Sequence, residues 1–454
     1  MKKRYFLAIF LGWFNLSLQA QELNFDAVLE CHNMDNMPGM AVRLEQSGKL
    51  IYKGAIGLAS LESQRKLHAD DVFQIGSVTK TFTAAAILKL SEQGKLSLKD
   101  NIGKFIPSIN PEYKNLTIEN ILSHTSGLDD YLSDPEVTAI YHKPASLDQV
   151  IEAISRRGLL SKAGEKYRYS NLGYILLGKI IEVSSGNSYQ EFLSQTFFIP
   201  LGMHNTYVMT EGTELEQVRG YTSNSQSPNN FLIAETSPDR EWNVDRSWIA
   251  SAGAIASTLN DMARWQQALT SGKVISNDNY QRMHSRALLL NGDKVNYGYG
   301  VDIYPISGLS SYSHQGRVPG YFSWHVYFPS EDLTATAFAN ADTKHPGPTL
   351  LDMIAKQLNL SPKRVSGKRE AEIARNLVGR YKSNDSKLLT IFFENGILYS
   401  QFDSEEKRVI LPREGNAYSY KCTENYFQLR ESHGSKELVP VHLYHGEQTP
   451  LTKL

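Results

Sequence analysis

A dense apolar run lies between residues 78 and 90, where most positions are apolar, small or threonine. It includes Phe82, Ile87 and Leu90, and the polar residues after it lead to Gly94. A helix that is apolar on nearly all sides is a buried helix, and glycine commonly stands just beyond a helix end. The pattern therefore predicts a buried helix over this run.

Strand patterns lie on both sides of this helix. Residues 40–44 and 50–53 flank a turn at 47–48 that contains glycine, which predicts a hairpin ahead of the helix. Residues 321–328 and 334–339 are rich in aromatic and β-branched side chains and predict two strands joined by a short turn. The main domain therefore combines helices with an antiparallel sheet.

Short strand-like runs recur near the C-terminus, at 388–393, 397–402 and 439–444. They contain no catalytic cluster and predict a small separate β domain over 376–454. The stretch before it, 361–375, is rich in Lys, Arg and Ser and is expected to be a partly helical linker.

The first twenty residues differ from the rest of the chain. Residues 1–4 are basic, residues 5–16 form an apolar run that is short for a membrane span, and Ala20 offers a small residue for cleavage. These features predict a signal peptide over 1–20, a main domain over 21–360, and a periplasmic or secreted protein with no membrane span after cleavage. Because Leu18 is bulky for its position, an uncleaved anchor stays open.

Composition, the absence of certain motifs and the cysteine count limit the functions that this sequence can have. The 454 residues allow two or three domains, and the net charge of -1 gives no electrostatic case for nucleic-acid binding. No metal or nucleotide motif is found, so no cofactor is expected. The two cysteines, Cys31 and Cys422, stand far apart in the chain; an exported protein could pair them, but the sequence gives no sign of proximity, so unpaired thiols are expected.

Ser77 and Lys80 form a Ser-x-x-Lys motif at the start of the predicted buried helix. Positions i and i+3 share a helix face, so the amine can reach the hydroxyl, and a serine can become a nucleophile this way without histidine. The alternative is a helix-capping serine followed by a solvated lysine, since Ser404 and Lys407 repeat the motif elsewhere.

Two further motifs carry candidate chemistry. Tyr169-x-Asn171 pairs a phenol, which a nearby ammonium would hold closer to its ionised form, with an amide that can orient substrate or lysine. His314-x-Gly316 is expected at the edge of the sheet, where glycine lets a substrate backbone approach. Each motif also occurs elsewhere in the chain, at Tyr113 with Asn115 and at His345 with Gly347, and His124 is interpreted as structural.

The order and spacing of these motifs resemble one known family. Residues 38–42, 73–84, 122–128 and 169–174 are similar to signatures of the serine β-lactamase and penicillin-binding-protein superfamily, in its class C β-lactamase-like branch. The resemblance implies an α+β fold, with an antiparallel sheet flanked by helices and an all-helical subdomain. The C-terminal β domain resembles the small barrel-like extension of some members.

The resemblance also implies roles for individual residues. Ser77 would be the acylated nucleophile, with Lys80 and Tyr169 as the proton-transfer pair. Asn171 would contact the substrate amide, and the backbone N–H groups of Ser77 and Arg317 would form the oxyanion hole.

One departure from the family pattern bears on the substrate. Many class C β-lactamases have Lys-Thr-Gly where this chain has His314-Gln315-Gly316, and histidine offers a weaker, pH-dependent charge for a substrate carboxylate. Arg317 could supply that charge instead. The resemblance therefore implies an exported serine hydrolase of amide or ester bonds, with D-amino-acid peptides as one substrate class. A true β-lactamase, a D-alanyl-D-alanine carboxypeptidase and a non-catalytic cell-wall peptide binder stay open.

Overall fold

The computed structural model describes residues 24–32, 36–209, 218–223, 230–234, 244–365, 368–420, 422–432, 434–443 and 446–454. The expected signal peptide lies outside this part of the chain. Within the described residues, no helix is both long enough and apolar enough to cross a membrane.

Twelve α-helices lie in the described ranges. They are α1 (Phe25–His32), α2 (Thr79–Glu92), α3 (Ile118–Leu122), α4 (Pro135–Thr138), α5 (Leu147–Ile154), α6 (Asn171–Ser185), α7 (Tyr189–Leu193), α8 (Arg246–Gly253), α9 (Leu259–Thr270), α10 (Asn277–Met283), α11 (Gly347–Leu358) and α12 (Lys368–Leu377). A short 3₁₀ helix, η1 (Gly76–Val78), leads into α2. Together η1 and α2 confirm the buried helix that the apolar run predicts, since Phe82, Ile87 and Leu90 have no exposed surface.

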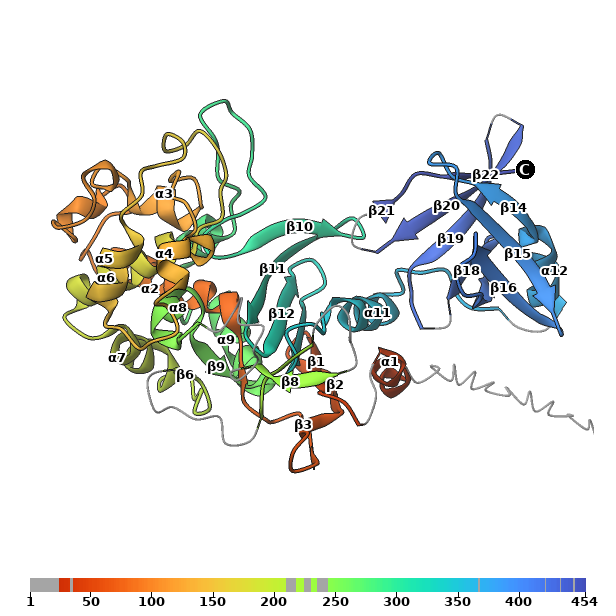
Figure 1. Cartoon of the computed structure of the whole chain (residues 1–454), viewed down its shortest axis with the longest axis horizontal. Helices are drawn as coiled ribbons and strands as arrows, with labels where there is room; N and C mark the ends of the chain where they lie inside the picture. The colour runs from red at the N-terminus through yellow and green to blue at the C-terminus, as the bar shows by residue number, and fades with distance from the viewer. Residues whose placement is uncertain are drawn as a thin grey trace, which may run out of the picture.

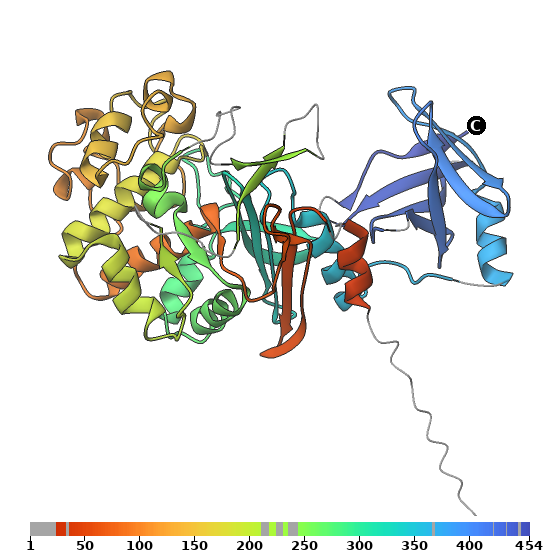
Figure 2. The ribbon, with the colours of Figure 1, turned by 60° about the horizontal axis from the view of Figure 1, so that its bottom comes forward.

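One antiparallel sheet forms the middle of the molecule, in the order β10-β11-β12-β13-β1-β2. Its strands are β1 (Met40–Gln46), β2 (Lys49–Ile56), β10 (Asp302–Ile306), β11 (Leu309–Val318), β12 (Tyr321–Phe328) and β13 (Leu333–Ala339). Both predicted hairpins are confirmed here. The helices α2 to α8 gather at one side of the sheet, as Figures 1 and 2 show.

Alternate residues of the sheet serve two separate cores. In β1, Met40, Val42 and Leu44 pack with α1 and α11, whereas Ala41 packs with the core that contains α2. This is the period-two alternation of a strand with both faces covered. The sheet therefore lies between a layer of α1 and α11 and the larger helical core.

Shorter strands connect the helical part. They are β3 (Leu58–Ser60), β4 (Arg65–Lys66), β5 (Phe73–Gln74), β6 (Tyr207–Val208), β7 (Tyr221–Ser223), β8 (Phe231–Ile233) and β9 (Ile255–Ser257). Strand β9 pairs with both β5 and β6. Because β5 directly precedes η1, this pairing fixes where the chain enters the central helix.

The C-terminal domain is a small β-barrel with its own core. Its strands are β14 (Gly379–Lys382), β15 (Leu388–Glu394), β16 (Ile397–Phe402), β17 (Arg408–Arg413), β18 (Ala417–Tyr420), β19 (Tyr426–Ser432), β20 (Ser435–His442), β21 (Gly446–Glu447) and β22 (Leu451–Lys453). Pairing of β19 with β20 closes the sheet on itself. Helix α12 covers this barrel through Ile373, Ala374 and Leu377, so the stretch expected as a linker contains much of a helix of the barrel domain.

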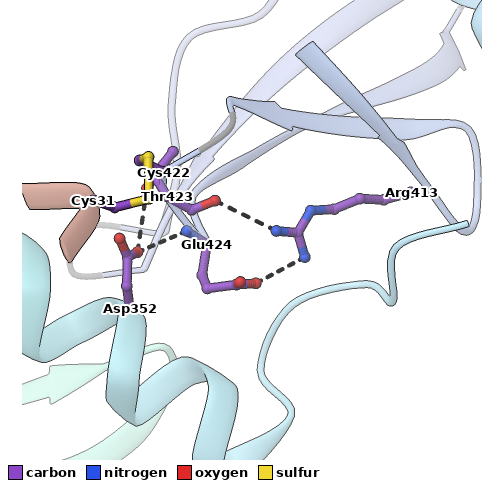
Figure 3. The surroundings of a disulfide bond; sticks show 6 residues. All are labelled: Cys31, Asp352, Arg413, Cys422, Thr423 and Glu424. Atoms are coloured by element: carbon purple, nitrogen blue, oxygen red, sulfur yellow. Dashed lines mark hydrogen bonds and ion pairs between the residues drawn. A yellow bond between two sulfur atoms is a disulfide. The ribbon is translucent and has the colours of Figure 1, made fainter. Parts of the chain in front are cut away.

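A disulfide joins the two domains and corrects the expectation of free thiols. Cys31 at the end of α1 is bonded to Cys422, which follows β18 in the barrel domain (Figure 3). The sequence separation is 391 residues, so only the fold brings the two sulfur atoms together. Close by, Asp352 of α11 accepts hydrogen bonds from the Thr423 hydroxyl (3.2 Å) and the Glu424 N–H (2.7 Å).

A second contact between the domains involves the β10–β11 hairpin. At its tip, the N–H and the hydroxyl of Ser307 both donate to the carbonyl oxygen of Leu443, at 2.8 and 2.7 Å. The N–H of Leu443 in turn donates to the Asn425 side chain (2.8 Å). The hairpin therefore reaches from the central sheet to the barrel, as Figure 1 shows.

Candidate active site

A cavity of about 1080 Å³ opens where the central sheet meets the helical part. It is lined by every residue that the motifs single out except the buried Lys80, namely Ser77, Tyr169, Asn171, His314, Gly316 and Arg317. These residues come from η1, the start of α6 and strand β11. The fold therefore brings three motifs that are far apart in the sequence to one site.

Local sequence places each group at an element boundary. Ser77 lies in η1, one turn before Lys80 in α2. The Tyr169 motif lies at the start of α6, where the Ser170 side chain accepts a hydrogen bond from the N–H of Gly173 (3.3 Å) and caps the helix. Asn171 is thus the first residue of a helix whose start is fixed.

The Lys80 amine is fully buried and has three polar neighbours. Its Nζ lies 2.8 Å from the Asn171 side-chain oxygen, 2.8 Å from the Ala252 carbonyl oxygen and 3.0 Å from the Ser77 hydroxyl oxygen. Burial lowers the pKa of Lys80 to about 7, although the nearby Asp130 carboxylate opposes this shift. A large fraction of this amine is therefore neutral near pH 7.

The three neighbours give the neutral amine one orientation. Asn171 and Ala252 offer only acceptor oxygens, so they take the two N–H groups of the neutral amine. The remaining lone pair then faces the Ser77 hydroxyl, which can donate its proton to Nζ. Lys80 is accordingly placed to remove a proton from Ser77.

The protonation state of Tyr169 differs from the one expected from the sequence, in which a nearby ammonium would hold the phenol closer to its ionised form. Burial raises the pKa of Tyr169 well above its usual value, although a hydrogen bond with the Ser77 hydroxyl opposes the rise. The Lys80 Nζ lies 4.8 Å from the centre of the Tyr169 ring, but this amine is itself only partly charged near pH 7. Tyr169 is therefore a protonated phenol that can donate a proton.

His314 also differs from the expectation of a pH-dependent charge. Burial, together with the Lys80 charge, lowers the pKa of His314 to about 3, so the ring is neutral. Its Nδ1 lies 2.6 Å from the carbonyl oxygen of Gln315 and must donate, and its Nε2 accepts from the Tyr297 hydroxyl at 3.0 Å. Both ring nitrogens are in use, so His314 supplies no cation for a substrate carboxylate.

His124 lies behind Tyr169, with ring centres 4.3 Å apart. Its Nδ1 accepts a hydrogen bond from the N–H of Ser170 (3.2 Å), and burial holds its pKa well below the usual value. It does not line the cavity. These contacts support the structural interpretation of this histidine.

Two glycines let β11 lie directly against the Ile75–Ser77 segment. A Cβ at Gly316 would lie 1.9 Å from the carbonyl oxygen of Ile75, and a Cβ at Gly76 would lie 2.8 Å from the backbone nitrogen of Arg317. Gly76 also has a φ of +50°, which L side chains rarely adopt. No other residue type fits at either position without moving the two backbones apart.

The register of β11 directs one backbone N–H toward Ser77. Val318 pairs with Tyr321 across a two-residue turn, so Gly316 is in a hydrogen-bonded position toward β12 and Arg317 is not. The Arg317 N–H is thus on the other edge of β11. Strand β10 pairs only as far as Ser313, so this edge faces the cavity at Arg317.

Sequence reasoning missed several residues in the cavity wall or directly behind it. Asp130 accepts a hydrogen bond from the Asn171 amide (3.0 Å), Tyr297 donates to His314, and Asp302 lines the wall at the start of β10. None of them belongs to a distinctive motif. Only the position of Asp130, just after the 122–128 signature, could have indicated it.

The repeated motifs lie in other surroundings. The Lys407 amine forms an ion pair with Glu394 on the barrel domain. Tyr113 is buried and donates to the carbonyl oxygen of Arg157 (2.6 Å). Across the described residues, no three His, Cys, Asp or Glu side chains gather closely enough to hold a metal ion.

Comparison with known proteins identifies the family. The model of the Beta-lactamase family matches residues 25–359. The chain belongs to this family of serine hydrolases. It is 27% identical to penicillin-binding protein 4* of Bacillus subtilis, over 86% of this chain and 88% of that protein.

Solved structures show the same fold. An octameric penicillin-binding protein homologue from Pyrococcus abyssi aligns with a TM-score of 0.64 and 22% identity, over 94% of this chain and 98% of that one. The D-amino acid amidase of Ochrobactrum anthropi SV3, complexed with D-phenylalanine, aligns with a TM-score of 0.63 and 24% identity, over 74% of this chain and 97% of the amidase. The first alignment spans the barrel domain as well, so the α+β fold with a C-terminal barrel is confirmed.

Proposed function

We propose that this protein is an exported serine hydrolase that cleaves amide or ester bonds of D-amino-acid peptides through an acyl-enzyme on Ser77. The observation that carries the proposal is the Lys80 amine, with its pKa lowered to about 7 and its lone pair facing the Ser77 hydroxyl. The site in this cavity is a complete nucleophile–base–acid set, which argues against a non-catalytic binder.

In the first step, Ser77 Oγ attacks the substrate carbonyl carbon while its proton passes to Lys80 Nζ. The negative charge on the carbonyl oxygen is stabilised by the N–H groups of Ser77 and Arg317. Tyr169 then donates its proton to the leaving group as the carbonyl–nitrogen or carbonyl–oxygen bond breaks, and it is reprotonated from Lys80. Water then attacks the acyl-enzyme by the same proton transfers in reverse. Tyr169 passes its proton to Lys80 and accepts one from the water, and Lys80 returns a proton to Ser77 Oγ as the acyl bond breaks.

The substrate class is supported by the relatives and by the state of His314. One structural neighbour is a D-amino acid amidase, and one relative is a penicillin-binding protein. A carboxypeptidase or a β-lactamase binds the substrate carboxylate with a cation. His314 is neutral here, so that charge would have to come from the exposed Arg317. This favours a D-amino-acid peptidase or amidase over the two alternatives.

Export is supported by the basic and apolar N-terminal sequence and by the disulfide between Cys31 and Cys422. Disulfides persist in oxidising compartments outside the cytoplasm. We therefore propose cleavage after residue 20 and a mature protein in the periplasm or medium.

The test measures hydrolysis of D-alanine p-nitroanilide and the intact mass of the protein after incubation with benzylpenicillin. Ser77→Ala should abolish turnover, whereas Ser404→Ala, which removes the serine of the second Ser-x-x-Lys, should leave it unchanged. Full activity of Ser77→Ala would refute the assignment. A stable penicillin adduct on Ser77 would favour the D-alanyl-D-alanine carboxypeptidase, and rapid penicillin hydrolysis the β-lactamase.

A further inference from the structure

One carboxylate that lines the cavity takes no part in the mechanism proposed above. Asp302 begins β10 and lines the same cavity as Ser77. Within the described part of the chain, no side chain forms an ion pair or hydrogen bond with this carboxylate. Burial raises the pKa of Asp302 to about 7 and is the only cause of the shift.

The groups around Asp302 are aromatic rather than cationic. The carboxylate acts electrostatically on five tyrosines from three segments, which are Tyr167, Tyr169, Tyr174, Tyr297 and Tyr304. The guanidinium next to this strand belongs to Arg286, which donates to the carbonyl oxygen of Ile303 (3.3 Å) and does not lower the pKa of Asp302. Asp302 is half-buried, and an ionised carboxylate in such a position with no cation is costly, so a bound cation would reduce this cost.

The other charged groups of the cavity also favour the binding of a cation. Asp130 lies on its wall, and one of that residue's carboxylate oxygens is buried with no hydrogen-bond partner in the described structure. Lys80, whose pKa is lowered to about 7, is only partly charged near pH 7, and His314 is neutral. The cationic side chain that lines the cavity is the exposed Arg317. The interior of the site therefore favours a positive group on the substrate.

The register of the hairpin gives the position of this group. Asp302 pairs with Ser313, four residues before Arg317 on β11. At a strand rise of about 3.4 Å per residue, the two positions are separated by about 14 Å along the strand. An ammonium bound by Asp302 therefore lies well beyond the α-amino group of the residue that acylates Ser77.

We propose that Asp302 forms a subsite for a primary ammonium group of the substrate, carried either by a long basic side chain of the acylating residue or by the amino terminus one residue further away. This inference rests on the proposed function, because it assumes that the acyl group of the substrate becomes bonded to Ser77. Aromatic walls and a carboxylate are a suitable environment for an ammonium, through both ion pairing and cation–π contact.

The first experiment needs no turnover of a peptide. Two fluorophosphonates are compared that differ only in the end of an alkyl chain, an ammonium in one and a methyl group in the other. Ser77 displaces fluoride from phosphorus in both, and the labelling rate is read from the intact mass. We expect the ammonium probe to label roughly tenfold to a hundredfold faster, the range of a charged hydrogen bond.

Variants then assign this preference to one residue. Asp302→Asn keeps the shape and removes the charge, and it should bring the ratio of the two labelling rates close to one. Asp293→Asn makes the same change on an exposed turn that does not line the cavity, and it should keep the ratio. Equal rates in the wild type, or an unchanged ratio in Asp302→Asn, would overturn the subsite while leaving the nucleophile assignment intact. Absence of labelling on Ser77 by either probe would instead refute the proposed function.

The pH profile provides a second measurement in the wild type. The ratio of the two labelling rates cancels the ionisation of Lys80, which is common to both probes. The ratio should rise as pH increases through about 7, because Asp302 then gains its charge. A ratio that is constant between pH 5 and pH 9 would contradict the inference.

Two substrate pairs distinguish the sources of the ammonium. In the first pair, the p-nitroanilides of Nα-acetyl-D-lysine and Nα-acetyl-D-norleucine differ in a side-chain ammonium. In the second, the p-nitroanilides of D-alanyl-D-alanine and its N-acetyl form differ in the amino terminus. The pair whose kcat/KM ratio falls in Asp302→Asn identifies the source, and no fall in either pair would contradict the subsite.

Discussion

At the scale of single residues, the site depends on what burial does to ordinary side chains. An exposed lysine is charged at neutral pH and cannot accept a proton, whereas burial makes the Lys80 amine a base near pH 7. Burial has the opposite consequence for Tyr169, which stays protonated and is the acid of the proposed mechanism. The proposed base and the proposed acid next to Ser77 thus come from two groups that titrate near pH 10 in water.

The first prediction concerns pH. Acylation requires neutral Lys80, so kcat/KM for a neutral ester should rise with pH through about 7 and level off above it. The Asp130 carboxylate stabilises the ammonium form and raises the pKa of Lys80. Asp130→Asn should therefore move the rising limb to lower pH. A limb that moves to higher pH, or does not move, would show that Lys80 is not the group that titrates.

The second prediction concerns Tyr169 as the proposed general acid. Tyr169→Phe keeps the ring and removes the proton donor, so kcat for an anilide should fall by about 10²- to 10⁴-fold. The loss should be smaller for a p-nitrophenyl ester, whose leaving group needs no proton. Tyr113→Phe is the matched control, since this tyrosine lies outside the cavity. Equal losses for both substrates would argue against the acid role.

At the scale of elements, the site depends on how closely β11 lies against the Ile75–Ser77 segment. The hydroxyl of Ser323 on β12 donates to the carbonyl oxygen of Ile75 (2.7 Å) and helps hold this segment to the sheet. The approach is possible because Gly316 has no Cβ. The oxyanion hole proposed above is therefore a property of two elements in contact.

The third prediction tests this contact. In Gly316→Ala the new Cβ would lie 1.9 Å from the Ile75 carbonyl oxygen, so β11 must move away from Ser77. Loss of one oxyanion donor should lower kcat by about 10²- to 10³-fold. Ser310→Ala changes an exposed position of the same strand and should have little effect. Thermal unfolding measured beside kcat separates this loss from a loss of folding, and unchanged kcat would contradict the proposed hole.

At the scale of the whole molecule, the barrel domain is attached at more than the chain connection. The disulfide joins α1 to the loop after β18, and Ser307 joins the cavity-lining hairpin to Leu443. Strands β10 and β11 carry both the proposed ammonium subsite and the proposed oxyanion donor. The barrel thus supports the outer end of the hairpin that forms one wall of the cavity.

The fourth prediction concerns the disulfide. Cys422→Ser should lower the free energy of unfolding by about 2–5 kcal/mol, the usual cost of losing a native disulfide, because the bond restricts the unfolded chain over a span of 391 residues. Cys31→Ser and the double variant should lose the same amount, since each removes the same bond. Chemical denaturation with and without a reducing agent measures this, and additive losses in the double variant would show that the thiols act separately.

The sequence by itself determined the candidate chemistry and the local elements. Ser77 and Lys80 stand in a motif whose spacing follows from helix geometry, Tyr169 and Asn171 stand in a second short motif, and the apolar run that follows Ser77 identifies the buried helix. Strand periodicity predicted the two hairpins and the C-terminal β domain. These features are local, so their signal is present in a few neighbouring residues.

The tertiary structure decided what depends on distant contacts. The pairing of Cys31 with Cys422 and the place of Asp302 in the cavity involve residues that no local pattern links. The protonated state of Tyr169 and the neutral state of His314 follow from burial, which only the packed chain creates. The sequence gives the identity of each residue, but the fold determines how far that residue is buried and which distant residues it contacts.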